Sequence, residues 1–229
     1  MKDLTTGSIH KNFLYFAIPI MLTSLLSTTF GMVDTAIAGL FLGSKGLAAL
    51  GATTSFFGLI ESVCYGLIYG VSMVIAQTFG AKQYSRLRTI FLSNLLITVV
   101  FLSVLAAVAI PLWRPVFAFL NVDPEITKEA HIYYVAFCMY MVFAIINHYC
   151  LSCSHSIGET TFPLYVSILG SLINIGGNLL SVTVLDLGIL GIAISTVVSA
   201  ALCSVLHLLR FRNYFKKIGT ISILVLILV

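Results

Sequence analysis

The chain has 229 residues, of which 59% are hydrophobic and only 9% are charged, and its formal net charge is +4. A soluble domain carries about 25% charged residues, so this composition excludes an ordinary soluble protein and indicates a chain embedded in a lipid bilayer. The basic residues stand at the ends of apolar segments and form no patch with interleaved aromatic residues, so no nucleic acid partner is expected.

Six apolar segments are long enough to cross a hydrocarbon core about 30 Å thick, which requires about 20 helical residues. They cover roughly residues 13–40, 47–79, 89–113, 131–154, 163–185 and 188–211. The first has no small-residue cleavage site behind a short apolar core, so we expect a retained helix rather than a signal peptide. The sequence therefore predicts an all-α polytopic membrane protein with a bundle of six transmembrane helices. A shorter apolar run, residues 221–229, is expected to begin a further hydrophobic segment.

The distribution of Lys and Arg predicts the orientation in the membrane. One side holds nine of these residues and the other three, if the six segments alternate in direction. The first side comprises Lys2, Lys11, Lys82, Arg86, Arg88, Arg210, Arg212, Lys216 and Lys217, and the second comprises Lys45, Arg114 and Lys128. We therefore expect both ends of the six-helix unit to lie in the cytoplasm and the protein to lie in the plasma (cytoplasmic) membrane.

The first segment contains a single carboxylate, Asp34. An ionisable group in a membrane span costs about 2.5–3.5 kcal/mol on insertion scales and is a functional-site hypothesis by default. At about 100° per residue, Thr23, Ser27 and Ala38 lie on the same helix face as Asp34, whereas Met32 does not. We expect this face to line a polar interior. The simpler alternative is an aspartate that only hydrogen-bonds a neighbouring helix.

Three further polar residues are expected at a depth similar to that of Asp34. Asn174 and Asn178 lie one turn apart on one face of the fifth segment, and Thr196 lies in the sixth. At about 1.5 Å per residue, Asp34, Asn178 and Thr196 all fall roughly 8–13 Å below the outer surface. A carboxylate, two amides and a hydroxyl group offer oxygen ligands for a hard cation, and the carboxylate could hold a proton instead. A purely structural hydrogen-bond network is the alternative.

Glu61 is the second carboxylate inside a predicted span. Thr54, Tyr65 and Ser72 share its helix face, so we expect Glu61 to point into the bundle. With Tyr65 it is a candidate for a substrate cavity, and the alternative is that it contacts only a neighbouring tyrosine.

The five cysteines all lie within apolar segments, which argues against a disulfide framework. The spacing of His148, Cys150, Cys153 and His155 superficially resembles a metal site. On a helix, however, the two histidines share a face and the two cysteines point to the opposite side, so no metal site is expected. A membrane-embedded enzyme that uses His148, His155 and Glu61 is an alternative from another class of protein. Because it lacks a convergent ligand motif, neither catalytic residues nor an organic cofactor are expected.

Four stretches of the chain together resemble the multidrug and toxic compound extrusion (MATE) transporters. They read AIPIMLTSLLSTTFGMVDTAIAGLFLGSKGLAALG, GVSMVIAQTFGAKQYSRLR, SIGETTFPLY and LGILGIAISTVVSA, and the resemblance runs from about Asn12 to Arg212. It implies a fold of two six-helix lobes related by pseudo-symmetry, with export driven by Na⁺ or H⁺. Residues 1–11 would then be a cytoplasmic N-terminus, 12–212 the N-terminal lobe, and 213–229 a connector with the truncated start of a further segment.

The resemblance also implies roles for individual residues. Asp34 takes the place of the family's first-helix carboxylate, and Pro19 that of the proline at which this helix bends. The positions matched to the cation or proton site on later helices are Asn174, Thr196 and, less closely, Tyr133, Asn147 and His148. Depth along the chain places Asn147 nearer the cytoplasm, which argues against direct ligation.

Two residues depart from the family pattern. Asn178 stands where the family often has a second carboxylate, so Asp34 would carry the charge of the site alone, which favours protons slightly over Na⁺. Glu61 stands where an uncharged residue is expected.

The leading hypothesis is an antiporter that exports amphipathic or cationic xenobiotics by alternating access. Asp34 would bind H⁺ or Na⁺, with no other cofactor, and the first helix would shift about Pro19. Its partners would be a small-molecule substrate, the bilayer and a second six-helix lobe. The alternatives are a lipid-linked oligosaccharide flippase of the same superfamily, which usually carries several cationic residues in its cavity, and an inactive truncated transporter fragment.

Overall fold

The computed structural model describes residues 8–217, and every element in this range is helical. The elements, in chain order, are α1 (Ile9–Gly80), α2 (Tyr84–Ala109), η1 (Ile110–Leu112), α3 (Trp113–Phe119), η2 (Pro124–Ile126), α4 (Thr127–Ser156), α5 (Thr161–Thr183) and α6 (Gly188–Lys217). The all-α prediction is confirmed. The apolar run at 221–229 lies outside the described residues.

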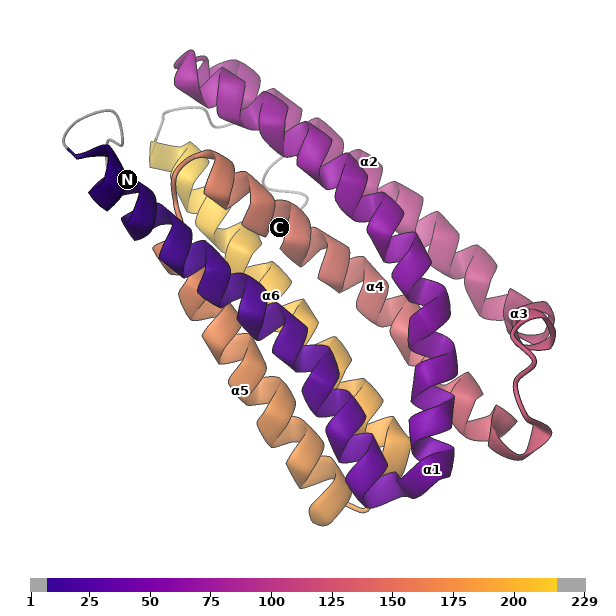
Figure 1. Cartoon of the computed structure of the whole chain (residues 1–229). Coiled ribbons are helices and arrows are strands. Elements are labelled where there is room, and N and C mark those ends of the chain that lie inside the picture. Colours follow the sequence, from indigo (N-terminus) through magenta and orange to yellow (C-terminus); the bar gives the residue numbers. More distant parts are fainter. Residues whose placement is uncertain (1–7, 218–229) are drawn as a thin grey trace.

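Both of the first two predicted segments lie within α1, which turns back on itself at Gly43 (Figure 1). Gly43 has φ 68° and ψ −161°, a combination that is open almost only to glycine because it has no Cβ. We call residues 9–42 the first arm and residues 44–80 the second arm. The backbone stays helical through Pro19, so the expected bend at this proline remains a prediction.

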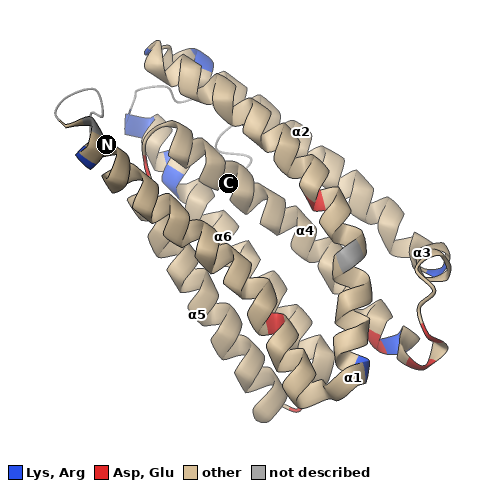
Figure 2. Cartoon of the chain, in the orientation of Figure 1, with Lys and Arg blue, Asp and Glu red and all other residues tan. Residues whose placement is uncertain are grey.

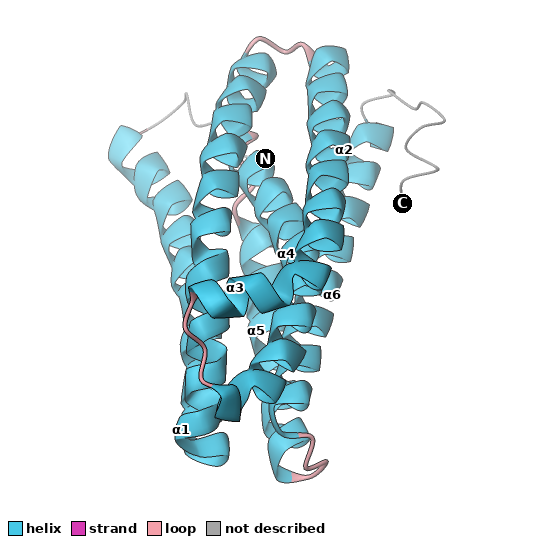
Figure 3. Ribbon diagram, turned by 90° about the vertical axis from the view of Figure 1, so that its right-hand side faces the viewer, coloured by secondary structure: helices cyan, strands magenta, loops and turns pink. Residues whose placement is uncertain are grey.

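Five helical stretches of the described chain are long and apolar enough to cross a membrane by length and composition. They are His10–Gly80, which contains both arms of α1, Tyr84–Phe119, Pro124–Ser156, Thr161–Thr183 and Gly188–Lys217. The connection between the third and fourth predicted segments is more structured than expected, because η1, α3 and η2 fold it into short helices (Figure 3).

The first arm of α1 runs beside α5, while α2 lies on the outside of the bundle next to the second arm and α4 (Figure 1). Two apolar clusters make up the core. One is built around Leu50, Phe57 and Tyr134, and the other around Phe91, Tyr149 and Phe211. Many large apolar side chains elsewhere are exposed, as expected where a helix faces lipid rather than protein.

Lys and Arg gather at the two ends of the bundle, and the ribbon between them is largely uncharged (Figure 2). The exceptions in the middle of the bundle are two acidic positions on α1, one on each arm. These are the two carboxylates that the sequence places inside membrane spans. The charge distribution therefore fits a bundle that crosses a bilayer, and the orientation of its ends stays a prediction.

Candidate functional site

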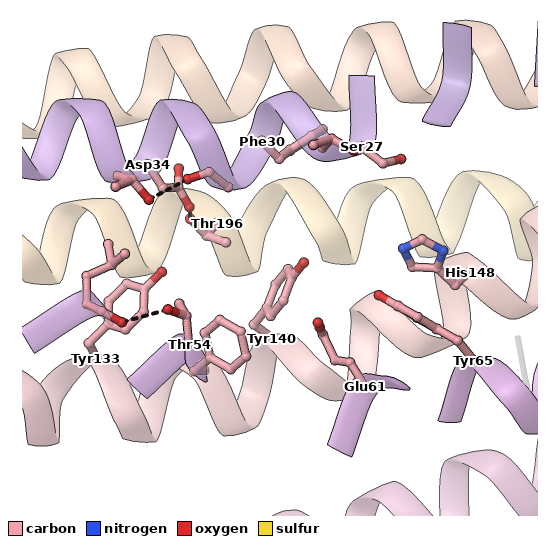
Figure 4. A pocket seen from close by; sticks show the side chains of 15 residues that line it. Ser27, Phe30, Asp34, Thr54, Glu61, Tyr65, Tyr133, Tyr140, His148 and Thr196 are labelled. Atoms are coloured by element: carbon pink, nitrogen blue, oxygen red, sulfur yellow. Dashed lines mark hydrogen bonds between the residues drawn. The ribbon is translucent and has the colours of Figure 1, made fainter. Parts of the chain in front are cut away.

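Asp34 lies on the first arm of α1 and is 4% exposed. Its two oxygens accept hydrogen bonds from two helices. The Nδ2 of Asn178 in α5 donates to Oδ1 at 2.6 Å. The Oγ1 of Thr196 in α6 donates to Oδ2 at 2.9 Å (Figure 4). Asn178 is fully buried and Thr196 nearly so. The carboxylate therefore joins the first arm to α5 and α6 in a site that is almost fully buried.

Asn174 completes the network without replacing either bond to Asp34. Its Nδ2 donates to Thr196 Oγ1 at 3.2 Å, and its Oδ1 accepts from Asn178 Nδ2 at 3.5 Å. The single hydroxyl proton of Thr196 is shared between Asp34 and the carbonyl of Ile192, which also lies 2.9 Å away. Three polar side chains thus surround one carboxylate, and we call the four residues the Asp34 network.

Small residues on α5 and α6 let the two helices come close enough to form the Asp34 network. A Cβ at Gly177 would lie 2.7 Å from Ser195 Oγ, and a Cβ at Gly191 would lie 2.4 Å from Ser181 Cβ. Larger side chains at either glycine would hold the helices apart. Close approach through glycine and serine is the usual way in which membrane helices pack.

The Asp34 network holds enough oxygen atoms to bind a small cation. Its acceptors are the two carboxylate oxygens, the amide oxygens of Asn174 and Asn178, and the hydroxyl of Thr196. The Oδ1 of Asn178 is buried and has no hydrogen-bond partner. Rotating this amide by 180° would direct its oxygen, instead of its NH₂ group, at Asp34. The same side chain can therefore face either an ionised carboxylate or a carboxylate that has gained a proton or a cation.

Asp34 also borders a cavity of about 490 Å³ that lies between the two arms of α1, α4 and α6 (Figure 4). The second arm contributes Glu61 and Tyr65 to the wall, and α4 contributes Tyr133 and His148. The ring centroids of Tyr65 and His148 are 4.6 Å apart. The cavity therefore contains both intramembrane carboxylates, one on each arm of α1.

The structure brings most of the predicted site residues together. Asp34, Asn174, Asn178 and Thr196 form the network, and Tyr133, His148, Glu61 and Tyr65 line the cavity beside it. Asn147 does not join them. It lines a smaller adjoining space of about 60 Å³ and its Oδ1 has no partner, in line with the depth argument against direct ligation. Ser72 does not line the cavity, although it shares a helix face with Glu61.

Sequence reasoning missed the aromatic wall of the cavity, which includes Phe30, Phe137 and Tyr140. A signal was present, because Tyr133, Phe137 and Tyr140 are spaced by four and three residues and so lie on one helix face. These side chains read equally well as lipid-facing or core residues in a chain rich in aromatics. Only the packing of α4 against α1 shows that they border a cavity.

The MatE family model matches residues 19–180 of this chain. Among curated proteins, the chain is similar to the "Probable multidrug resistance protein YoeA" of Bacillus subtilis, with 27% identity over 84% of this chain and 42% of the relative. It is also similar to the "Multidrug export protein MepA" of Staphylococcus aureus, with 24% identity over 91% of this chain and 46% of the relative. The chain thus spans less than half the length of these relatives.

Solved structures share the fold of this chain over about half of their own length. The Vibrio cholerae MATE transporter VcmN in the bent form superimposes with a TM-score of 0.83 at 21% identity, over 89% of this chain and 46% of that one. An outward-facing and an inward-facing structure of a multidrug resistance MATE family transporter give TM-scores of 0.81 and 0.72, at 19% and 21% identity. They cover 95% and 78% of this chain, and 49% and 41% of theirs. From the family-model match and the shared fold, we conclude that this chain belongs to the MatE family of transporters.

Proposed function

We propose that residues 12–212 form the N-terminal lobe of a cation-coupled antiporter that exports xenobiotics, organic cations among them, by alternating access. A second six-helix lobe would complete the transporter, and residues 213–229 would begin the connection to it. Both ends of the six-helix unit would lie on the cytoplasmic side of the plasma membrane. The names of two relatives state multidrug resistance and multidrug export, and the proposal assigns the same kind of function to this chain.

The observation that carries the proposal is the buried carboxylate of Asp34, held by α5 and α6 at the edge of a cavity. A carboxylate in this position changes its interactions with both helices when it gains a proton or a cation. Ionised, it attracts the NH₂ group of Asn178 and the hydroxyl of Thr196. Once neutralised, it loses about half of that attraction, because hydrogen bonds to a charged group are about twice as strong as those between neutral groups.

Loading of Asp34 would therefore loosen the contact between the first arm and the pair α5–α6. We propose that the first arm then shifts, with Pro19 as the bending point, and that the cavity changes the side on which it opens. Pro19 leaves one position of the helix without a backbone N–H, which lowers the cost of bending there. The coupling ion would be H⁺ or Na⁺, and the single carboxylate of the network favours H⁺ slightly.

A lipid-linked oligosaccharide flippase fits less well. Such a protein needs cationic groups to face the phosphates of its substrate. No Lys or Arg is found among the residues that line the cavity in the described chain, and the two charged residues there are both acidic. The cavity is suited to cationic rather than anionic cargo.

The test is export of a fluorescent organic cation from cells that produce the complete transporter. Asp34→Asn should abolish export while membrane insertion remains at the level of the unmodified protein. Asp186→Asn, which changes an exposed carboxylate in the α5–α6 turn, is the matched control and should export normally. Full export by Asp34→Asn would overturn the proposal, and imposed Na⁺ and pH gradients in proteoliposomes would identify the coupling ion.

A further inference from the structure

Glu61 lines the same cavity as Asp34, but the two carboxylates differ in their hydrogen-bond partners. Asp34 accepts hydrogen bonds from Asn178 and Thr196. For Glu61, the described part of the chain offers no hydrogen bond and no ion pair, and its side chain points into the cavity between Tyr140 and Tyr65 (Figure 4). The carboxylate of Glu61 is therefore free to pair with a group that enters the cavity.

The wall around Glu61 is aromatic. Tyr65 lies one turn further along the second arm, and Phe137 and Tyr140 face the same space from α4. The rings of Phe137 and Tyr140 have centroids 4.9 Å apart and are tilted by 55°, so their faces point in different directions. Aromatic faces attract cations, and the attraction grows when the cation is removed from water.

The chemistry of this wall discriminates between kinds of cation. A hard metal ion such as Na⁺ or Ca²⁺ prefers several oxygen ligands, which the Asp34 network offers and the surroundings of Glu61 do not. A substituted ammonium group is weakly hydrated and binds well to a carboxylate flanked by aromatic rings. The cavity volume of about 490 Å³ lies within the range of small-molecule sites, about 300–1,000 Å³.

We propose that Glu61, Tyr65 and Tyr140 form a subsite that binds the ammonium head of an amphipathic substrate, separate from the Asp34 network. This inference rests on the proposed function, because it assigns the substrate charge to one carboxylate and the coupling ion to the other. It makes Glu61 the residue that distinguishes cationic from neutral compounds of the same shape.

The experiment is equilibrium dialysis of a matched probe pair with the purified complete transporter in detergent, without any ion gradient. The probes are 4-phenylbutyl-trimethylammonium and its neutral isostere, in which a tert-butyl group replaces the trimethylammonium group. The unmodified protein should bind the cation at least about tenfold more tightly than the isostere, which corresponds to about 1.4 kcal/mol. Glu61→Gln should weaken binding of the cation at least about fivefold and leave the affinity for the isostere unchanged. Tyr65→Leu should weaken binding of the cation more than that of the isostere.

Glu129→Gln at the start of α4 is the matched control, and it should keep the full preference. The proposal is overturned if Glu61→Gln also keeps the preference, or if the unmodified protein binds both probes equally or binds neither. Because binding is measured without a gradient, these outcomes do not require ion-driven transport. Export that survives Asp34→Asn would count against the proposed function, whereas an unchanged preference in Glu61→Gln would count only against this subsite.

Discussion

The hydrogen bond between Asn178 and Asp34 joins α5 to the first arm of α1, and a double-mutant cycle can measure its strength. Asn178→Leu keeps a side chain of similar size and removes the Nδ2 donor that lies 2.6 Å from Asp34 Oδ1. Asp34→Asn keeps the shape of the acceptor and removes its charge. If the bond is charge-assisted, the two substitutions together should destabilise the protein by less than the sum of their separate effects.

The expected coupling energy follows from the burial and the charge of the pair. Hydrogen bonds between membrane helices average about 0.6 kcal/mol in double-mutant cycles, with a maximum of about 1.7 kcal/mol. Bonds to a charged group contribute about 1.5–3 kcal/mol in proteins generally. Because Asp34 is 4% exposed and Asn178 is fully buried, water competes little for either partner. We therefore expect a coupling energy of about 1.5 kcal/mol, near the upper end of the membrane values.

The assay is reversible unfolding of the purified protein in mixed micelles by titration with SDS. Asn94→Leu is the matched control, because Asn94 Nδ2 donates to the carbonyl of Ile90 at 2.9 Å within its own helix, α2. Asn94→Leu combined with Asp34→Asn should be additive within about 0.5 kcal/mol. A coupling energy below about 0.5 kcal/mol for Asn178 and Asp34 would refute the reasoning, because it would show that Asn178 does not donate to an ionised carboxylate.

Two backbone positions give further predictions, each read out by the same unfolding titration. Gly191→Ala would place a Cβ 2.4 Å from Ser181 Cβ and should destabilise the protein by about 1–3 kcal/mol through overpacking between α5 and α6. Gly176→Ala, whose Cβ meets nothing within 4 Å, should be tolerated, and an equal loss in both variants would contradict the packing argument. Gly43→Ala should cost about 1–3 kcal/mol, because alanine is strained at φ 68°. Gly58→Ala in the helical second arm should leave the stability of the protein unchanged or raise it slightly. If Gly43→Ala has the same effect, the turn does not require glycine.

The helical fold could be predicted because long apolar segments in a bilayer must satisfy their backbone hydrogen bonds internally. What composition did not reveal was local geometry. The turn at Gly43 replaces a loop with a single residue of unusual backbone angles, so two predicted segments join into α1. The sequence does not reveal the short helices η1, α3 and η2, because segments of three to seven residues show too few turns for a periodic pattern.

The Asp34 network was predictable to an unusual extent because depth along a membrane helix can be counted from the turns. Residue number alone predicts a matched depth for Asp34, Asn178 and Thr196, and the structure joins them by direct hydrogen bonds. The contrast between Asp34 and Glu61 could not be predicted in this way. It depends on which side chains on neighbouring helices present donors, and that is decided by how the helices pack.

The separate positions of Asp34 and Glu61 on α1 lead to a last prediction. Asp34 lies nine residues before Gly43 and Glu61 lies eighteen after it, so at about 1.5 Å per residue their depths differ by roughly 13 Å. Two unit charges about 15 Å apart interact by about 1 kcal/mol at an effective dielectric constant of 20, which is about fivefold in affinity. An ionised Asp34 should therefore help Glu61 to bind a cationic substrate, and a loaded Asp34 should not.

Asp34→Asn mimics the loaded state, so it should lower the affinity for the trimethylammonium probe by about fivefold and leave the affinity for the neutral isostere unchanged. Equilibrium dialysis of both probes measures this, with Asp186→Asn as the control. By linkage, a bound cationic substrate must weaken binding of the coupling ion at Asp34 by the same factor. Equal affinities in Asp34→Asn and the unmodified protein would show that the two carboxylates do not communicate by charge. Coupling would then have to come from movement of the first arm alone.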